Sequence, residues 1–332
     1  MSFSKHKKYV EVGDTVVVYL SPKQMYPLKI KEEEVYQTKF GALKHDDIIG
    51  KQYGSKVNCS RGFVHILDMT PELWTVILPH RTQILYGPDI SFILLQLQLK
   101  PGSLIIEAGT GSGSLAHCIA RTVAPNGKLF TYDFHQERAS AAQQEFKDHG
   151  LDSIVTVQHR DICEDGFNVS HLVDAVFLDL PHPWEAIDSA NAVLKNGGRI
   201  CCFSPCIEQV QKSGQTLSSL NFMDVETYEC LLRPYEVRDM KLKKFSHQLN
   251  KLNINNVSKQ DEVIIVEEES NTENHDVIER KRPKLDSIWK CSTSNNNSNN
   301  YEMVNYNIVY MNTEVAGHTG FLTFATKFVH NQ

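Results

Sequence analysis

The sequence lacks three features that would place a protein in a membrane or outside the cell. It has no long hydrophobic run, because its most apolar stretch, residues 90–99, is interrupted by Gln96 and Gln98 and is shorter than the roughly 20 apolar residues that cross a bilayer. Residues 1–5 contain no signal-peptide core. The eight cysteines include no C-x-x-C pair, which favours reduced thiols in an intracellular protein and argues against a zinc site.

The chain also lacks an excess of positive charge. It carries 34 Lys and Arg against 40 Asp and Glu. This balance argues against a protein that binds nucleic acid through a large net positive charge. The charge is uneven, however: residues 1–61 hold 11 basic against 7 acidic residues, a difference of +4, and residues 246–305 hold 7 against 10, a difference of −3. A basic N-terminal segment and an acidic later segment suit an RNA-binding enzyme whose partner supplies more positive surface. The alternative is that these charged side chains are simply exposed to solvent.

At the centre of the chain, a strand, a glycine-rich loop and a helix follow one another directly. Residues 104–106 are apolar, as in a strand buried on both faces, and the helical pattern that starts at Ser112 stops at Pro125. Around the loop lie three glycines, Gly109, Gly111 and Gly113. Glycines let a backbone approach a ligand closely, and the first turn of a helix presents free N–H groups. The unit therefore predicts a site for a nucleotide-like cofactor, with a simple tight turn as the alternative.

The glycine spacing and two nearby acids narrow the choice of cofactor. The order G-x-G-x-G does not match the dinucleotide-binding fingerprint G-x-G-x-x-G. Glu107 precedes the loop, and Asp133 ends the next strand, residues 128–133, where a carboxylate can bind ribose hydroxyls. The form E-x-G-x-G-x-G resembles motif I of the S-adenosylmethionine-dependent methyltransferases, and this resemblance implies S-adenosylmethionine as the cofactor.

Strands and helices alternate through the middle of the chain. We predict helices at residues 90–99, 136–149, 184–194 and 207–220, and further strands at residues 154–160, 175–180, 199–203, 224–230 and 236–242. Such alternation is typical of an α/β fold with a doubly wound parallel sheet. Ligands of these sheets bind beyond the carboxyl ends of the strands, so Asp133, Asp161 and Asp179, which each close a strand, should converge on one cleft.

Four regions differ in composition. We predict a small β-rich, RNA-contacting domain at residues 1–70 and a methyltransferase domain at residues 71–245. Residues 246–303 are polar and include an Asn-rich tract, which predicts a disordered insertion. A strand-like pattern resumes after the insertion. A final strand within residues 304–332 should therefore complete the methyltransferase sheet.

Basic and aromatic residues are interleaved along the β-rich region. They are Lys39, Phe40, Lys44, Lys51, Tyr53, Lys56, Arg61 and Phe63. Such interleaving suits phosphate contacts combined with base stacking. The alternative is the ordinary half-exposed surface of a small barrel.

Two short motifs lie in the insertion. Residues 280–284, R-K-R-P-K, have the composition of a nuclear localisation signal, which predicts a nuclear protein, while a surface charge run is the alternative. Residues 263–269, V-I-I-V-E-E-E, could add as an edge strand to a partner with a basic rim, in the manner of binders of small ubiquitin-like modifiers.

A second chemical motif, D-L-P-H-P-W at residues 179–184, follows a predicted buried strand. Pro181 and Pro183 fix the loop, so the Asp179 carboxylate should be held rigidly beside the cofactor cleft, as a catalytic or substrate-orienting group requires. A helix-capping role for Asp179 is disfavoured, because the two prolines separate it from the helix near Trp184.

Five motifs span nearly the whole chain outside the insertion. They are R-T-Q-I-L-Y at residues 81–86, E-A-G-T-G-S-G-S at 107–114, D-L-P-H-P-W at 179–184, F-S-P-C-I-E-Q-V at 203–210 and G-H-T-G-F-L-T-F-A-T-K at 317–327. Together they resemble the family of catalytic subunits of the eukaryotic tRNA (adenine-58-N1)-methyltransferases. The resemblance implies methylation of N1 of adenosine 58 in the tRNA T-loop by a heterotetramer, in which two copies pair with two copies of a non-catalytic, RNA-binding paralogue.

The resemblance also implies roles for single residues. Asp179 would be catalytic, Asp161 would lie near the adenine amino group of the cofactor, and Asp133, where many relatives have the longer Glu, would bind the ribose. The implied cofactor-binding residues are Leu85, Tyr86, Gly109, Gly111, Ser112, Gly113, Ser114, Asp133, Arg138, Asp161, Ile162 and Asp179. The implied tRNA-binding residues are Thr38, Lys39, Phe40, Arg61, Phe63, Gln83, Pro181, Ser204, Pro205, Gln209 and Thr319. No metal is expected.

The implied chemistry agrees with these residue types. N1 of neutral adenine has an in-plane lone pair that attacks the sulfonium methyl directly, and a carboxylate that accepts from the amino group stabilises the developing charge. The target base must also leave its folded tRNA context. One alternative is a methyltransferase of the same fold that acts on protein isoaspartate or a small molecule. The predicted β-rich domain at residues 1–70 disfavours this alternative. The other is an inactive tRNA-binding scaffold, which the intact glycine loop, Asp133 and Asp179 disfavour.

Overall fold

The computed structural model describes residues 3, 7–79, 82–233, 235–243, 303–311 and 320–328. The chain divides into two compact units, one formed by residues 1–232 with 314–332 and the other by residues 233–313. Apart from Met303, the predicted insertion and its two motifs lie outside the described residues. None of the helices in this described part of the chain is both long and apolar enough to cross a bilayer.

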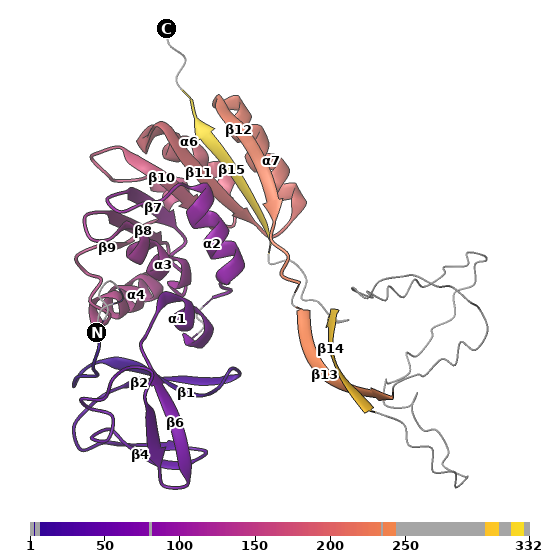
Figure 1. Cartoon of the computed structure of the whole chain (residues 1–332). Helices are drawn as coiled ribbons and strands as arrows, with labels where there is room; N and C mark the ends of the chain where they lie inside the picture. Colours follow the sequence, from indigo (N-terminus) through magenta and orange to yellow (C-terminus); the bar gives the residue numbers. More distant parts are fainter. Residues whose placement is uncertain are drawn as a thin grey trace, which may run out of the picture. The chain divides into compact units, whose positions relative to one another are not determined.

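The β-rich region is built on a four-stranded antiparallel sheet (Figure 1). In spatial order its strands are β2 (Gln24–Lys29), β1 (Thr15–Ser21), β6 (Gly62–Leu67) and β5 (Lys56–Cys59). A hairpin beside it pairs β3 (Val35–Thr38) with β4 (Gly41–Lys44). Alternate residues of β1 and β6, among them Val16, Val18, Val64 and Ile66, are buried in one small core, as the two-residue period of a strand requires. The β-rich region expected from the sequence therefore has its own core.

The rest of this unit is organised around a seven-stranded sheet. Its strands, in spatial order, are β12 (Phe222–Glu229), β15 (Phe321–Lys327), β11 (Leu194–Ser204), β10 (Val173–Leu178), β7 (Leu104–Ala108), β8 (Lys128–Asp133) and β9 (Val155–His159). The strands from β11 to β9 are parallel, which confirms the predicted doubly wound fold. β15, however, runs antiparallel to both of its neighbours. A parallel return needs a crossover segment, usually a helix, and the described residues between β12 and β15 form none.

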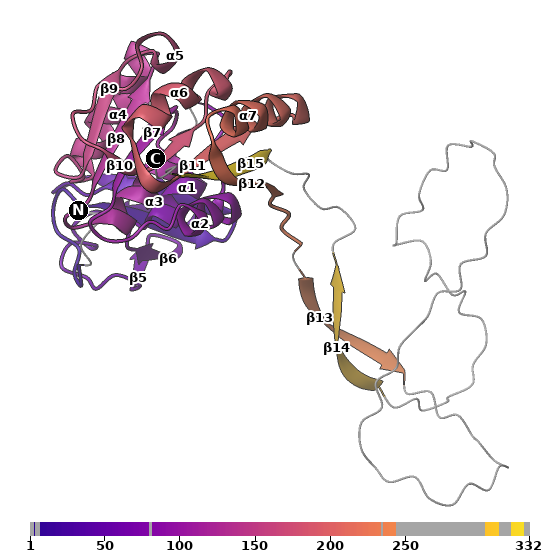
Figure 2. The same cartoon turned by 90° about the horizontal axis from the view of Figure 1, so that it is seen from above.

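Helices cover both faces of the sheet (Figures 1 and 2). On one face lie α1 (Pro71–Ile77), α2 (Gly87–Gln96), α3 (Ser114–Val123) and α4 (Gln136–Asp148), and on the other α5 (Ile162–Asp165), α6 (Pro183–Val193) and α7 (Ile207–Ser219). Successive strand residues alternate between the two cores: Ile105 belongs to the core under α2, α3 and α4, and Ile106 to the core under α6 and α7. This burial on both faces explains why the strand is apolar at consecutive positions.

The second unit contains a two-stranded antiparallel ribbon. β13 (Tyr235–Lys243) pairs with β14 (Met303–Met311) in an unbroken register from Tyr235 opposite Met311 to Lys243 opposite Met303. The sequence pattern assigns residues 236–242 to the methyltransferase domain and residues 304–311 to the segment that completes its sheet, and the structure corrects both assignments. The two segments pair with each other, and among the described residues of 304–332 β15 alone completes the seven-stranded sheet.

Candidate active site

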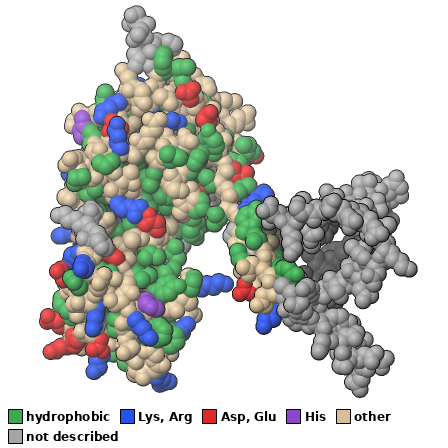
Figure 3. Space-filling model, in the orientation of Figure 1, with side chains coloured by type: hydrophobic (Ala, Val, Ile, Leu, Met, Phe, Trp, Pro, Cys, Tyr) green, Lys and Arg blue, Asp and Glu red, His purple; other side chains and the backbone are tan. Residues whose placement is uncertain are grey.

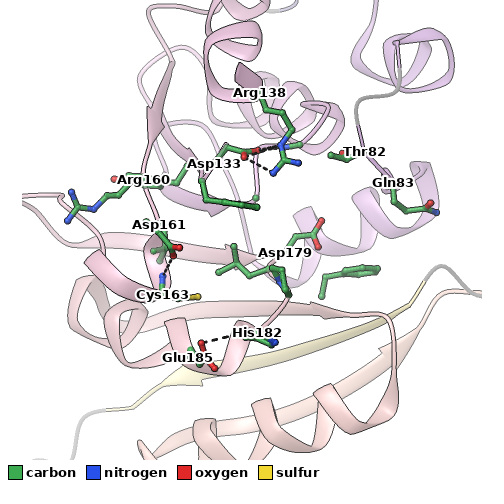
Figure 4. A pocket seen from close by; sticks show the side chains of 18 of the residues that line it. Thr82, Gln83, Asp133, Arg138, Arg160, Asp161, Cys163, Asp179, His182 and Glu185 are labelled. Carbon is green, nitrogen blue, oxygen red and sulfur yellow. Dashed lines mark hydrogen bonds and ion pairs between the residues drawn. The ribbon is translucent and has the colours of Figure 1, made fainter. Parts of the chain in front are cut away.

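Three acidic residues, each at the carboxyl end of a parallel strand, line one cavity of about 580 Å³. Asp133 ends β8, Asp161 follows β9 and caps α5, and Asp179 follows β10. Figure 4 shows the three side chains around the same space. The parallel strands bring their carboxyl ends to one edge of the sheet, where ligands of such folds bind. The volume lies within the range of small-molecule and cofactor sites.

Donors on several sides hold the Asp133 carboxylate in one orientation. It accepts the backbone N–H of Gly111 at 3.1 Å and that of His135 at 2.9 Å. The guanidinium of Arg138, from α4, pairs with it at 2.9 Å. These contacts fix the plane of a buried carboxylate at the rim of the cavity, which suits the recognition of a diol such as that of a ribose.

The glycine loop lies against the segment that carries Asp179. Gly109 has a φ of +101°, and a Cβ atom at this position would overlap the Asp179 carbonyl oxygen. At Gly111, φ is +53° and a Cβ atom would lie 2.8 Å from Thr82 Oγ1. A side chain at either position would therefore push apart the walls of the cavity, so only glycine lets the loop pack this closely against Asp179 and Thr82.

Two acids beside the loop, the buried Glu107 and the half-buried Asp179, have raised pKa values. Burial raises the pKa of Asp179 to about 6. Burial also raises the pKa of Glu107 to about 8, with further contributions from the charges of Asp179 and Asp133. The Thr131 hydroxyl donates to Glu107 at 2.6 Å, which partly opposes that rise. The floor of the site is thus poor in water, and a positive charge brought near it would favour the ionised carboxylates.

Most of the predicted cofactor-binding residues lie together in the structure. The main cavity is lined by Leu85, Gly109, Gly111, Asp133, Arg138, Asp161, Ile162 and Asp179. A smaller pocket that shares the glycine loop is lined in addition by Ser112, Gly113 and Ser114. Tyr86 does not line either pocket; it precedes α2 as its N-cap and is exposed.

The two serine hydroxyls of the loop bind protein groups. Ser112 Oγ accepts the backbone N–H of Thr82 at 3.1 Å. Ser114 Oγ lies 2.9 Å from Thr75 Oγ1 and donates to the Leu85 carbonyl at 3.2 Å. These hydrogen bonds tie the segment at residues 82–85 to the glycine loop, so the side chains of both serines hold the cavity wall in place.

The predicted tRNA-binding residues of the β-rich region form one surface, which is separate from the cavity lining. Thr38, Lys39 and Phe40 lie at the β3–β4 turn, and Arg61 lies at the β5–β6 turn. The two turns are joined by a hydrogen bond from the Arg61 N–H to the Phe40 carbonyl at 2.8 Å. Phe63 is 44% exposed, and the Lys56 ammonium lies 3.7 Å from its ring centroid. Positive charge and aromatic faces therefore occur side by side.

The other predicted tRNA-binding residues lie in different environments. Gln83 and Pro181 line the cavity, and Gln209 Nε2 donates to the Pro181 carbonyl at 3.0 Å. Pro205 is exposed directly after β11. Ser204 is fully buried, because the alternation of β11 turns it inward, so its side chain cannot contact tRNA as predicted. Thr319 lies outside the described residues.

Sequence reasoning missed several residues of the cavity wall, including Thr82, Phe134 and His182. Phe134 directly follows Asp133, and the Arg138 guanidinium lies 5.1 Å from its ring centroid. An aromatic residue after the acid that ends β8 was a readable signal, because a flat ring at this edge can stack on a base. Thr82 and His182 gave no comparable signal, since only the folded loops bring them to the cavity (Figure 4).

Comparisons with known proteins agree with this geometry. Residues 62–327 match the family described as tRNA methyltransferase complex GCD14 subunit. The catalytic subunit of tRNA (adenine(58)-N(1))-methyltransferase from Dictyostelium discoideum is 49% identical over 237 residues, which cover 70% of this chain and 76% of that protein. The chain belongs to this family. The corresponding subunit from Candida albicans is 37% identical over 334 residues, which cover 98% of this chain and 99% of that protein.

A solved structure extends the likeness to the fold. An S-adenosylmethionine-dependent O-methyltransferase from Thermotoga maritima superposes with a TM-score of 0.70, 26% identity and coverage of 98% of this chain and 97% of that one. As a member of the methyltransferase family, the protein is an enzyme that uses S-adenosylmethionine as its methyl donor. Its residues fit that cofactor, because Gly109, Gly111 and the fixed carboxylate of Asp133 line the same cavity of about 580 Å³.

Proposed function

We propose that the enzyme transfers a methyl group to N1 of adenosine 58 in the T-loop of tRNA. The observation that carries this proposal is the position of Asp179, a half-buried carboxylate directly after β10, in a cavity shared with the glycine loop. The names of the relatives supply the substrate by homology. A deep, partly apolar cavity suits a single base that has left its stack.

The cavity residues divide into two groups in this proposal. Asp133 and the glycine loop hold the ribose and the methionine part of the cofactor, Phe134 stacks on its adenine, and Asp161 accepts from the adenine amino group. Bound S-adenosylmethionine supplies a methyl group activated by its sulfonium charge. Asp179 and Pro181, across the cavity, are left to face the substrate base.

Asp179 orients the target adenine and stabilises the transition state. Its carboxylate accepts a hydrogen bond from the exocyclic amino group, which turns the N1 lone pair toward the methyl group. Positive charge develops on the adenine ring as the new bond forms, and the carboxylate stabilises that charge in a site with little water. No general base is needed for the transfer, because N1 of neutral adenine carries no proton.

The β-rich region contacts the tRNA outside the cavity. Its surface combines Lys39, Lys56 and Arg61 with the rings of Phe40 and Phe63. Basic side chains position the phosphate backbone, and exposed rings stack on unpaired bases of a folded RNA. The β-rich region would therefore hold the tRNA while the adenosine is extruded into the cavity.

The enzyme works as a heterotetramer with a non-catalytic paralogue. The ribbon of the second unit supports such a partner, because both of its faces expose apolar residues; Figure 3 shows apolar side chains on one side of it. Val237 and Val309 face each other across the strands on one side, and Met240 and Tyr306 on the other. A lone two-stranded ribbon is marginally stable in water, and burial of both faces against another subunit would stabilise it. The partner would also supply the positive charge that this chain lacks.

The proposed place of action is the nucleus. The basic motif at residues 280–284 supports it, because clustered Lys and Arg residues are typical of nuclear localisation signals. A fluorescent fusion whose basic motif residues are all replaced by alanine should lose nuclear accumulation. A variant that still accumulates in nuclei would contradict the role of the motif.

Methyl transfer from labelled S-adenosylmethionine to unmodified tRNA tests the proposed reaction. The assay uses the full-length chain with and without its paralogous partner, and a tRNA with guanosine in place of adenosine 58 as the control. Transfer that requires the partner and disappears with the substituted tRNA is expected. Cofactor binding without transfer in the presence of the partner would contradict the proposal and favour a scaffold role.

A further inference from the structure

A buried pair of histidines lies directly behind the glycine loop. His117, on α3, and His149, after α4, are 0% and 5% exposed. His117 Nε2 lies 2.8 Å from His149 Nδ1. Rings of the same core surround the pair, with Phe3 and Phe146 each 4.8 Å from the His117 ring, centroid to centroid. Neither histidine lines the cavity, so the pair can act on the cofactor only through the loop.

The hydrogen bonds of the pair define which nitrogen atoms carry hydrogen. His117 Nδ1 lies 2.7 Å from the Gly113 carbonyl oxygen, which can only accept, so Nδ1 carries the hydrogen. With the hydrogen of His117 on Nδ1, its Nε2 accepts from His149 Nδ1. Burial lowers the pKa of His149 to about 4. The chain of hydrogen bonds thus runs from His149 through His117 to Gly113.

This chain determines the direction of one peptide group in the glycine loop. The Gly113 carbonyl accepts from the ring of His117 and also from its backbone N–H, at 3.1 Å. In a planar trans peptide the carbonyl and the following N–H point in opposite directions. Because the Gly113 carbonyl points along α3, the N–H of Ser114 points out of the start of that helix. The first N–H groups of a helix are available to an anionic ligand group.

We propose that His117 and His149 are positioning residues for cofactor binding. His149 fixes the tautomer of His117, and His117 fixes the Gly113–Ser114 peptide so that the Ser114 N–H meets the carboxylate of the methionine part of S-adenosylmethionine. This inference rests on the proposed placement of the cofactor against the glycine loop. Phe3, Trp74 and Phe146 keep water away from the relay.

Binding measurements on the full-length chain test the relay. His117→Leu removes the donor to Gly113, and we expect the Kd for S-adenosylmethionine to rise about tenfold, in line with one buried hydrogen bond. His117→Asn places an amide N–H near the position of Nδ1 and should stay within about threefold of the native Kd. His149→Leu should raise the Kd by about threefold and His149→Asn should restore it. Ile119→Val, a buried change on the same helix, should lower Tm and leave the Kd unchanged.

A spectroscopic signature separates positioning from mere packing. In ¹⁵N-histidine spectra, with signals assigned by their loss in the His117→Asn and His149→Asn variants, both rings should carry hydrogen on Nδ1. An Nε2–H tautomer of His117 would overturn the proposal, as would His117→Asn binding as weakly as His117→Leu at native Tm. His117, Glu145 and His149 each offer a ligand atom within 4.8 Å of one another, so stoichiometric metal in the purified chain would also overturn it.

The placement of the cofactor has its own control. Asp133→Ala should weaken S-adenosylmethionine binding without any change in the signals of His117 and His149, because Asp133 bonds to Gly111, His135 and Arg138 and not to the relay. An unchanged Kd in Asp133→Ala would overturn the cofactor placement and the role of the relay with it. A weakened Kd in Asp133→Ala combined with a native Kd in His117→Leu would overturn the relay alone.

Discussion

The Asp179 carbonyl oxygen occupies the space that a side chain on Gly109 would need. Gly109 belongs to the glycine loop after β7, and Asp179 follows β10, the neighbouring strand. The two sides of the cavity, one for the cofactor and one for the substrate base, therefore meet at a backbone contact. A substitution in the glycine loop should therefore also displace the Asp179 segment, because neither segment can move independently.

Gly109→Ala should impair cofactor binding more than its cost in stability explains. The new methyl group must displace the Asp179 segment, so we expect the Kd for S-adenosylmethionine to rise at least about tenfold. Gly54→Ala is the matched control, because Gly54 also has a positive φ, +87°, but has open space around its Cβ position. That control should cost about 1 kcal/mol of stability and leave the Kd unchanged. Calorimetric titration of both variants measures the difference, and equal Kd values would argue against the contact.

Asp179→Ala and Asp179→Asn should lower turnover far more than they weaken cofactor binding. Loss of a charge that stabilises the transition state typically lowers kcat by about 10²–10³-fold, whereas the Kd for S-adenosylmethionine should change by less than about threefold. Asp174→Asn, at the opposite end of β10 and paired with Lys195, should leave kcat unchanged. Single-turnover methyl transfer and titration supply the two numbers. Equal losses of turnover and binding would make Asp179 a binding residue only.

The pH dependence of activity should follow the ionisation of Asp179. Burial raises its pKa to about 6, and only the carboxylate can stabilise a positive adenine ring. The value of kcat/KM should therefore rise as pH increases through about 6 and level off above it. In Asp179→Asn this rise should be absent. A native profile that stays flat from about pH 5 to about pH 8 would contradict the assignment.

Glu107→Gln should stabilise the protein more at high pH than at low pH. The pKa of Glu107 is raised from 4.5 to about 8 in the folded state. A carboxyl group with a raised folded pKa contributes stability below its unfolded pKa, and that contribution is lost as pH rises through the folded value. Glutamine does not ionise, so the stability gained by the variant should grow by roughly 4 kcal/mol between pH 4.5 and pH 8. Denaturant titrations at several pH values measure it, and a stability difference that stays constant with pH would contradict the raised pKa of Glu107.

Phe63→Ala should weaken tRNA binding and leave the cofactor site intact. Stacking of a base on an aromatic ring is worth about 1–3 kcal/mol, so KM for tRNA should rise about tenfold while the Kd for S-adenosylmethionine stays constant. Tyr26→Ala is the matched control, since Tyr26 is an exposed aromatic residue on β2 of the same sheet. Similar KM values for Tyr26→Ala and Phe63→Ala would contradict a specific role for the Lys56–Phe63 pair.

The sequence predicts best what depends on short stretches of chain. The predicted strand at residues 128–133 coincides with β8, and the glycine loop lies directly after β7, because burial on both faces and glycine spacing act over a few residues. Asp133, Asp161 and Asp179 could be placed together because parallel strands share one carboxyl edge.

What the sequence could not predict depends on long-range pairing. β15 is antiparallel to both of its neighbours, and this direction depends on residues far away in the sequence. The local sequence of β15 does not predict it. The burial of Ser204 depends on the strand that lies beside it. His117 and His149 are 32 positions apart, and their contact exists only because α3 and α4 pack on the same face of the sheet.

The position of β15 between β11 and β12 means that the sheet cannot be completed before β15 has been synthesised. β12 leaves the ribosome long before β15, since residues 230–320 separate the two strands. In the finished sheet, however, β12 is joined to β11 only through β15. An incomplete chain therefore exposes the edge of β11 and leaves β12 without its neighbour. A nascent chain needs protection from aggregation at this edge until residues 321–327 have been made.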